Sequence, residues 1–251
     1  NRVIEKAIRG SAPAQINVPR DYWTQVIDIE LPPIVRFERQ GGGKDAIERA
    51  AKMLSDAKFP VILSGAGVVI GDAINECKSL AEKLDAPVCN GYQHNDSFPG
   101  SHPLAVGPLG YNGSKAAMQL ISKADVVLAL GTRLNPFSTL PGYGIDYWPK
   151  DANIIQVDMN PDRIGLTKKV TVGIAGDAKQ VALQILEKLS SNAGDNGREE
   201  RKNLIHQTKS AWLQTLTSLD HEDDDPGTVW NKEARERDKD RMSPRQAWRA
   251  I

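Results

Sequence analysis

PVILSGAG, at residues 60–67, is a short apolar run that ends in a glycine turn, and it is the first of three such units. The others are DVVLALGTR at residues 125–133 and NIIQVDMNP at residues 153–161. Polar residues are too few to alternate with apolar ones, which favours parallel strands covered on both faces. The carboxyl ends of such strands are where α/β sheets hold ligands, so the turns predict a nucleotide or cofactor domain.

Helical periods separate these units. Apolar residues recur at helical spacing over residues 44–57, 72–84, 114–123 and 178–189, and two further apolar runs lie at residues 86–90 and 170–174. Ser114 is placed to cap the third of these helices. Strands that alternate with helices in this way predict a three-layer α/β sandwich with a parallel sheet of about six strands. Gly65, Gly131 and Asp158 should then line one edge of that sheet.

The two ends of the chain differ from this middle part. We expect a helix over Arg2–Arg9, a short strand over Ala14–Val18, and a connector without a regular period over Tyr22–Gly43. After a polar linker at residues 192–197, the pattern predicts an amphipathic helix over Arg201–Leu219. The chain does not begin with Met, and we interpret it as an interior piece of a longer protein.

Charge and cysteine content narrow the class of protein. The 251 residues carry 32 basic and 32 acidic side chains, which gives no electrostatic basis for binding nucleic acid or an anionic membrane. No apolar stretch reaches the length of a membrane-spanning helix. Cys77 and Cys89 are too few for a disulfide scaffold, and without a secretory signal we expect the protein to be cytoplasmic.

Gly65 and Gly67 form part of a dinucleotide-binding fingerprint. The full motif, G-x-G-x-x-G, needs a third glycine where this chain has Ile70. Two interpretations stay open. The turn can face a phosphate, or it can be a tight strand-to-helix turn that needs the backbone freedom of glycine.

Two polar residues at the ends of the other strands, Asp158 and Arg133, can likewise serve either a ligand or the fold. Asp158 can hold a ribose hydroxyl, or it can join Asn160 in capping the helix that starts near Pro161. Arg133 can clamp a phosphate with its planar guanidinium, or it can form a surface ion pair.

No catalytic or metal-binding motif accompanies these residues. His94, His102, Cys89 and Asp96 do not have the spacing of a metal-ligand set. The acidic run over residues 221–225 lacks the glycine and the spaced ligands of a calcium loop. We therefore assign no catalytic residue and no metal ligand to this chain.

An ordered set of motifs resembles one enzyme family. AQINVPRD at residues 14–21 is similar to the end of the first domain in thiamine-diphosphate enzymes of the acetohydroxyacid synthase group. Further matches follow in the same order at residues 60–67, 99–104, 107–113, 125–133, 157–161 and 176–178. Their order and spacing resemble the central domain of that family over residues 1–190, and MSPRQ at residues 242–246 resembles the entry to its third domain.

The resemblance implies a division of the chain. Residues 1–23 would end a pyrimidine-binding domain, residues 24–43 would be a linker, and residues 44–190 would be the central α/β domain. Residues 191–241 would be a linker with an amphipathic helix, and residues 242–251 would start a diphosphate-binding domain. In the family the first and third domains act on thiamine diphosphate and Mg²⁺, so the chain alone should be inactive.

A finer resemblance concerns the substrate. NGYQHNDSFP at residues 90–99 and GTRLNPF at residues 131–137 look most like the sulfoacetaldehyde acetyltransferases within this group. The implied reaction converts sulfoacetaldehyde and phosphate to acetyl phosphate and sulfite, in a homodimer or homotetramer. The alternative is a nucleotide-binding domain (for ADP, FAD or NAD), without chemistry of its own, of another member such as acetolactate synthase.

The resemblance also implies which residues would contact a bound nucleotide. Gly65, Gly67, Arg133 and Asp158 match positions that touch FAD or ADP in some relatives, and Gly110 lies in the segment that approaches the thiamine site. Asn160 stands where a nucleotide-binding relative can carry a basic residue. We therefore expect a weak or vestigial site, with ADP bound on the order of 0.1–1 mM and no FAD retained on purification.

Overall fold

The computed structural model of the protein describes residues 2–10, 12–33 and 38–221. The predicted start of a third domain, residues 242–251, and the preceding residues 222–241 lie outside the described residues. Contacts between Cα atoms divide the chain into two compact units, residues 1–205 and 206–251. The first unit contains the sheet, and the described part of the second is the latter part of helix α8 (Arg198–His221).

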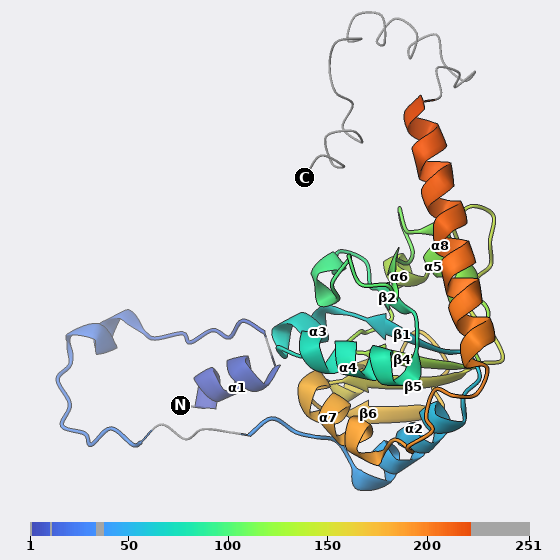
Figure 1. The fold of residues 1–251 in the computed structure, drawn as a ribbon. Coiled ribbons are helices and arrows are strands. Elements are labelled where there is room, and N and C mark those ends of the chain that lie inside the picture. The colour runs from blue at the N-terminus through green and yellow to red at the C-terminus, as the bar shows by residue number, and fades with distance from the viewer. Residues whose placement is uncertain (1, 11, 34–37, 222–251) are drawn as a thin grey trace, which may run out of the picture. The chain divides into compact units, whose positions relative to one another are not determined.

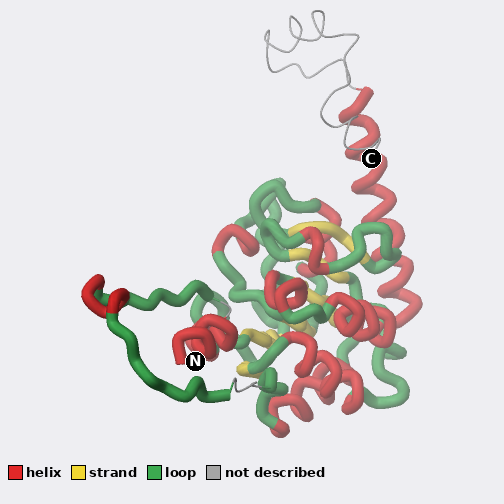
Figure 2. The backbone as a smooth tube through the Cα atoms, turned by 90° about the vertical axis from the view of Figure 1, so that its left-hand side faces the viewer, coloured by secondary structure: helices red, strands yellow, loops and turns green. Residues whose placement is uncertain are grey.

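A parallel six-stranded sheet forms the centre of the first unit (Figure 1). In chain order its strands are β1 (Pro60–Ser64), β2 (Val88–Asn90), β3 (Ala105–Pro108), β4 (Val126–Leu130), β5 (Asn153–Asp158) and β6 (Val172–Ala175). They lie in the order β3-β2-β1-β4-β5-β6, and every pairing is parallel. In Figure 2 the strands lie among helices and loops. The predicted fold class is confirmed.

Helices cover both faces of the sheet. In β1, Ile62 belongs to a buried core with residues of α2 (Lys44–Asp56), α4 (Ile74–Leu84) and α7 (Ala178–Lys188), whereas Val61 and Leu63 belong to a second core with α5 (Lys115–Ile121). Figure 1 shows α4 and α7 next to each other against the sheet. Successive residues of a strand point to opposite faces, and both faces are buried, which explains why the strands are apolar throughout.

Helix capping follows the sequence closely. The Ser114 hydroxyl accepts a hydrogen bond from the backbone N–H of Ala117 at 3.3 Å, as predicted for the cap of α5. The carboxylate of Asp177 accepts from two backbone N–H groups in the first turn of α7, and Asp177 also pairs with Arg39 at 3.0 Å. The backbone carbonyl of Gln40 accepts from Asp177, so residues 39–40 of the connector are fixed to the sheet domain.

The structure adds elements that sequence periodicity did not predict. Strand β3 lies between the apolar run at residues 86–90 and the helix expected at residues 114–123, and it was not predicted because its Ala-Val-Gly-Pro sequence is too short to show a period. Short helices also occur at α3 (Ala66–Ile70) and α6 (Pro136–Thr139), with single 3-10 turns η1 (Arg20–Thr24), η2 (Asn95–Ser97) and η3 (Pro161–Arg163). Of these, η3 begins where the sequence placed the start of a helix, near Pro161. All but η1 follow the carboxyl end of a strand, where they shape the site.

The N-terminal segment gives one confirmation and one correction. Helix α1 (Arg2–Gly10) forms as predicted. The predicted strand over Ala14–Val18 is wrong, because these residues are exposed and pair with no strand among the described residues. A strand needs a neighbour to satisfy its backbone N–H and C=O groups, and the described chain offers none at this segment.

Arg201 fixes the first turn of α8 to the end of the sheet opposite the strand-end turns. Its guanidinium is buried and donates five hydrogen bonds, all to backbone carbonyl oxygens. The acceptors are the carbonyls of Lys58, Leu84, Asp85, Gly194 and Asn196. Two of them end α4, where carbonyl groups have no partner within the helix and carry partial negative charge.

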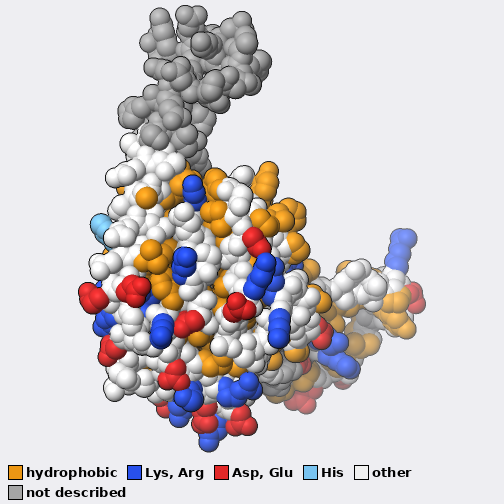
Figure 3. Space-filling view, turned by 90° about the vertical axis from the view of Figure 1, so that its right-hand side faces the viewer, with side chains coloured by type: hydrophobic (Ala, Val, Ile, Leu, Met, Phe, Trp, Pro, Cys, Tyr) orange, Lys and Arg blue, Asp and Glu red, His pale blue; other side chains and the backbone are white. Residues whose placement is uncertain are grey.

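The surface matches the balanced composition. On the face shown in Figure 3, acidic and basic side chains are interspersed rather than gathered by sign. Within the described ranges, every helix is too short or too polar to cross a membrane.

Candidate functional site

A cavity opens at the centre of the sheet, at the carboxyl ends of the strands. The chain turns from β1 toward β2 and β3 on one side, and from β4 toward β5 and β6 on the other. Ligands of open α/β sheets bind at such a reversal of strand order. The cavity has a volume of about 730 Å³, which suits a small organic ligand. Gly65, Gly67, Gly131 and Asp158 all line it, so the prediction that the three turns share one edge is confirmed.

The glycines of this edge pack against one another. A Cβ atom on Gly67 would lie 2.7 Å from the Cα atom of Gly131, and a Cβ atom on Gly65 would lie 2.6 Å from the Cβ atom of Thr132. Gly131 also has a positive φ of 62°. The turn after β1 and the turn after β4 therefore come together only because both lack side chains.

This packing uses the amide groups of the glycine turn. The N–H of Gly65 donates to the carbonyl of Leu130 at 3.1 Å, and the N–H of Gly67 donates to the carbonyl of Gly131 at 2.8 Å. The N–H of Val68 donates to the carbonyl of Gly65 at 3.0 Å. These three donors are committed to the protein, so they do not form the ring of free amides with which a phosphate-binding turn holds its ligand.

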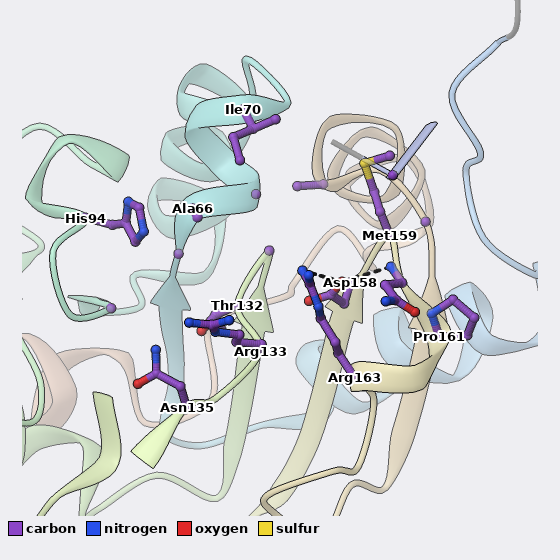
Figure 4. A pocket seen from close by; sticks show the side chains of 18 of the residues that line it. Ala66, Ile70, His94, Thr132, Arg133, Asn135, Asp158, Met159, Pro161 and Arg163 are labelled. Carbon is purple, nitrogen blue, oxygen red and sulfur yellow. Dashed lines mark hydrogen bonds and ion pairs between the residues drawn. The ribbon is translucent and has the colours of Figure 1, made fainter. Parts of the chain in front are cut away.

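The end of β5 brings a carboxylate and a guanidinium together. Asp158 is buried, and its Oδ1 atom accepts from the backbone N–H of Asn160 at 2.9 Å. The Nη1 atom of Arg163 lies 4.0 Å from the same oxygen, and the Asn160 side chain caps η3 through the N–H of Asp162. Figure 4 shows Arg163 and Asp158 meeting above β5. Asn160 thus has the capping role that the sequence left open, whereas Asp158 still faces the cavity.

Arg133 lies on the neighbouring loop, after β4. It is exposed, it lines the cavity, and it makes no ion pair with any residue that the structure describes. Its neighbour Thr132 is buried, and Asn135 caps α6 by accepting from the N–H of Ser138 at 2.9 Å. The surface ion pair considered for Arg133 does not form within the described residues, so the guanidinium is available to a ligand.

The opposite wall is built on buried polar groups at the ends of β1 and β2. The Asn90 amide donates to Ser97 Oγ at 3.1 Å, and the Ser64 hydroxyl donates to the carbonyl of Ser97 at 3.1 Å. These bonds hold the loop that carries His94, which Figure 4 shows across the cavity from Asp158. His94 lies 3.9 Å from Asp96, too far for a hydrogen bond.

Gly110 is the one predicted site residue that does not line the cavity. Its φ is 79°, and a Cβ atom there would lie 1.8 Å from the carbonyl oxygen of Phe137. It allows the loop after β3 to approach α6, beside an aromatic cluster of Tyr92, Tyr111 and Phe137. Tyr111 and Phe137 are each more than half exposed.

The described residues provide no site for the Mg²⁺ that accompanies thiamine diphosphate in the family. Among them, no three His, Cys, Asp or Glu side chains come close enough to hold a metal ion. Asp72 and Asp177 each follow a glycine, but Asp72 pairs with Lys179 at 2.9 Å and Asp177 caps α7. Burial raises the pKa of the Cys77 thiol to about 12, which makes it a packing residue rather than a nucleophile.

Sequence reasoning missed Arg163 and Gln156, as well as Arg2 and Lys6 of α1, which also line the cavity. Arg163 brings a positive charge to the edge where Asn160 does not. Gln156 is buried inside the apolar strand β5 and bonds to the loops after β4 and β5. A polar residue within an apolar strand was the available signal, but its partners could not be read from the sequence.

Fold and site together define a domain of a known class. The chain belongs to the family described as thiamine pyrophosphate enzyme, central domain, whose model matches residues 47–188. This confirms the family that the ordered motifs predicted.

Particular relatives refine this picture. The chain is similar to sulfoacetaldehyde acetyltransferase of Roseovarius nubinhibens, with 74% identity over 251 residues, which is 100% of this chain and 42% of that relative. It is also 33% identical over 179 residues to the acetolactate synthase large subunit of Corynebacterium glutamicum, which is 70% of this chain and 28% of that protein. The chain thus spans less than half the length of these relatives.

A solved structure supports the fold. Benzoylformate decarboxylase from Polynucleobacter necessarius superposes with a TM-score of 0.59 and 23% identity, over 71% of this chain and 33% of that chain. At this level of identity the likeness bears on the fold alone.

Proposed function

We propose that the chain is the central part of a thiamine-diphosphate-dependent acetyltransferase that converts sulfoacetaldehyde and phosphate to acetyl phosphate and sulfite. The observation that carries the proposal is the high identity, along the whole chain, to a protein named for that activity. The identity to an acetolactate synthase subunit is far lower and covers less of the chain. Because the chain spans only part of these relatives, the activity is that of the whole protein.

The proposed reaction balances without an oxidant. The carbon–sulfur bond of sulfoacetaldehyde breaks and sulfite leaves with the electron pair of the sulfur. The aldehyde carbon loses its proton, the CH2 carbon gains one to become the acetyl methyl, and a phosphate oxygen, losing its proton, bonds to the carbonyl carbon. Thiamine diphosphate, when bound, supplies the carbanion that this chemistry needs. We assign that cofactor and Mg²⁺ to the pyrimidine-binding and diphosphate-binding domains, whose end and start we place at residues 1–23 and 242–251.

For the cavity we propose a nucleotide, with ADP as the simplest candidate. Gly65 and Gly67 line the cavity, Arg133 has no competing ion pair among the described residues, and Asp158 faces the opening as a ribose acceptor. Gly110 belongs to a separate segment, which we propose faces the thiamine site.

The remaining assignments follow from the family. We propose a cytoplasmic enzyme that acts on small molecules as a homodimer or homotetramer. The linker at residues 24–43 and the segment at residues 191–241 would connect the central domain, residues 44–190, to its neighbours.

Product stoichiometry tests the proposal. The full-length protein that contains this chain, supplied with sulfoacetaldehyde, phosphate, thiamine diphosphate and Mg²⁺, should release sulfite and acetyl phosphate in equal amounts. The 251-residue chain alone should release neither. Turnover by the chain alone would refute our placement of the active site. Sulfite release without acetyl phosphate would refute phosphate as the acceptor of the acetyl group.

A further inference from the structure

Arg39, in the connector that precedes α2, makes two polar contacts with the sheet domain. Its Nη1 atom donates to the Oδ2 atom of Asp177 at 3.0 Å and to the backbone carbonyl of Gly71 at 3.0 Å. Asp177 is the N-cap of α7, and Gly71 is the C-cap of α3. One nitrogen atom of the connector therefore joins the ends of two helices that are far apart in the sequence.

Gly71 makes this contact possible. It stands one place beyond Ile70, which occupies the position of the third glycine in the dinucleotide fingerprint. A Cβ atom on Gly71 would lie 2.7 Å from the carbonyl oxygen of Gly67 and 3.2 Å from the Oδ2 atom of Asp177. A side chain here would force the end of α3 to shift and would crowd the carboxylate that Arg39 holds. The glycine therefore serves the contact with the connector.

Asp177 depends on Arg39 to balance its charge. The Asp177 side chain is 1% exposed, and its Oδ1 atom accepts from the backbone N–H groups of Lys179 and Gln180. Its Oδ2 atom accepts from Arg39, whose side chain is half exposed. Without the guanidinium the buried carboxylate would lose its cation, which is costly. The charge of Asp177 therefore favours the attached position of the connector.

Both helices that Arg39 joins contribute to the lining of the cavity. Ala66, Gly67 and Ile70 of α3 line it, and so do Gly176 and Ala178 at the start of α7. Figure 4 shows Ile70 on α3 at the cavity. A displacement of the connector would therefore act on two walls of the cavity at once.

We infer that Arg39 is a latch that couples the connector to the cavity wall. When Arg39 leaves Asp177 and Gly71, the start of α7 and the end of α3 loosen together. The segment that precedes the connector thus has a physical route to the cavity through one side chain. The inference goes beyond the proposed function, because it depends neither on the ligand of the cavity nor on the reaction.

Hydrogen exchange of the full-length protein that contains this chain tests the inference, with mass spectrometry resolving single amides. The N–H of Asp177 donates to the carbonyl of Gln40 at 2.8 Å and reports whether the connector is attached. The N–H of Ala73 donates to the carbonyl of Val68 at 2.8 Å and reports the end of α3. The N–H of Ile62, in the central strand β1, reports the stability of the whole domain.

Two variants separate the latch from other charges at the same place. In Arg39→Gln, exchange at Asp177 and at Ala73 should rise together by about tenfold, the lower end for a charge-assisted contact because Arg39 is half exposed. Exchange at Ile62 should keep its wild-type rate. Lys179→Met is the matched control, since this ammonium pairs with acidic side chains of the α3–α4 corner rather than with the connector. In this control, exchange at Asp177 should stay at the wild-type rate.

Each other outcome counts against the latch. Faster exchange at Asp177 alone would make Arg39 an anchor of the connector without coupling to α3. Wild-type exchange at both Asp177 and Ala73 would show that Arg39 holds neither segment. An equal rise at Ile62 would mean that Arg39 supports the whole domain, which also overturns the inference. A rise at Asp177 in Lys179→Met as large as in Arg39→Gln would overturn the assignment of the latch to Arg39.

Discussion

Replacing Arg201 with methionine should destabilise the chain more than any other single change at the start of α8. The side chain is 1% exposed, and its five donors all reach backbone carbonyls at the end of the sheet opposite the cavity. Methionine fills similar space but leaves those oxygens without their charged donor. The perturbation thus removes hydrogen bonds while largely preserving packing volume.

The size of the effect can be bounded from the contacts. Hydrogen bonds to a charged group contribute about 1.5–3 kcal/mol each, but five of them do not add, because burying the guanidinium is itself costly. Each buried carbonyl oxygen that loses its donor costs about 1–3 kcal/mol, and avoiding the desolvation of the guanidinium offsets part of that sum, which leaves a net loss of about 3–5 kcal/mol. We expect a loss in this range from the free energy of unfolding, out of a typical total of about 5–15 kcal/mol.

Urea unfolding followed by circular dichroism measures this loss. Arg201→Lys keeps the charge but has at most three donors, so it should fall between wild type and Arg201→Met. Arg198→Gln is the matched control: Arg198 is partly exposed and pairs with Asp85 and Asp195, so its loss should cost about 1 kcal/mol or less. An Arg201→Met chain within about 1 kcal/mol of wild type would refute the reasoning.

Three smaller predictions follow from other contacts. Cys77 and Cys89 are buried, and burial raises the pKa of both thiols, so a disulfide reagent should label neither in the native chain and both in denaturant; rapid native labelling would contradict this. Gly67→Ala should cost about 1–3 kcal/mol in urea unfolding, because the added methyl meets backbone; unchanged stability would contradict the glycine packing. The hydrogen bond from Lys179 lowers the pKa of Asp72. This pair therefore stabilises the chain above the unfolded pKa of about 3.9, and its contribution is lost as pH falls through the lower pKa of the folded state. Lys179→Met should flatten only this acidic part of the curve of stability against pH, and an unchanged acidic part would show that the pair contributes nothing.

Much of the fold could be read from the sequence because the central strands are buried on both faces. Such a strand must be apolar at every position, so the runs at β1, β4 and β5 stand out without any knowledge of their partners. The glycine turns that end β1 and β4 also mark where the strands stop. From these features alone the cavity edge was placed correctly.

What could not be read depends on contacts between distant segments. Strand β3 is four residues long, and it forms because β2 offers it a hydrogen-bonding edge. Ala14–Val18 has strand-like alternation but no such edge among the described residues. The sequence also does not show which carbonyl accepts from the N–H of Gly67, or that Arg163 lies beside Asp158. Nor does it show that Gln156 bonds to two separate loops, because these contacts exist only in the folded chain.

The comparison of two substrates tests the central claim most directly. The full-length protein should be assayed with thiamine diphosphate, Mg²⁺ and phosphate, on sulfoacetaldehyde and on pyruvate in parallel, with acetyl phosphate, sulfite and acetolactate all measured. The account predicts acetyl phosphate and sulfite from sulfoacetaldehyde, strictly dependent on phosphate, and no acetolactate from pyruvate. Acetolactate from pyruvate, with no acetyl phosphate from sulfoacetaldehyde, would contradict it.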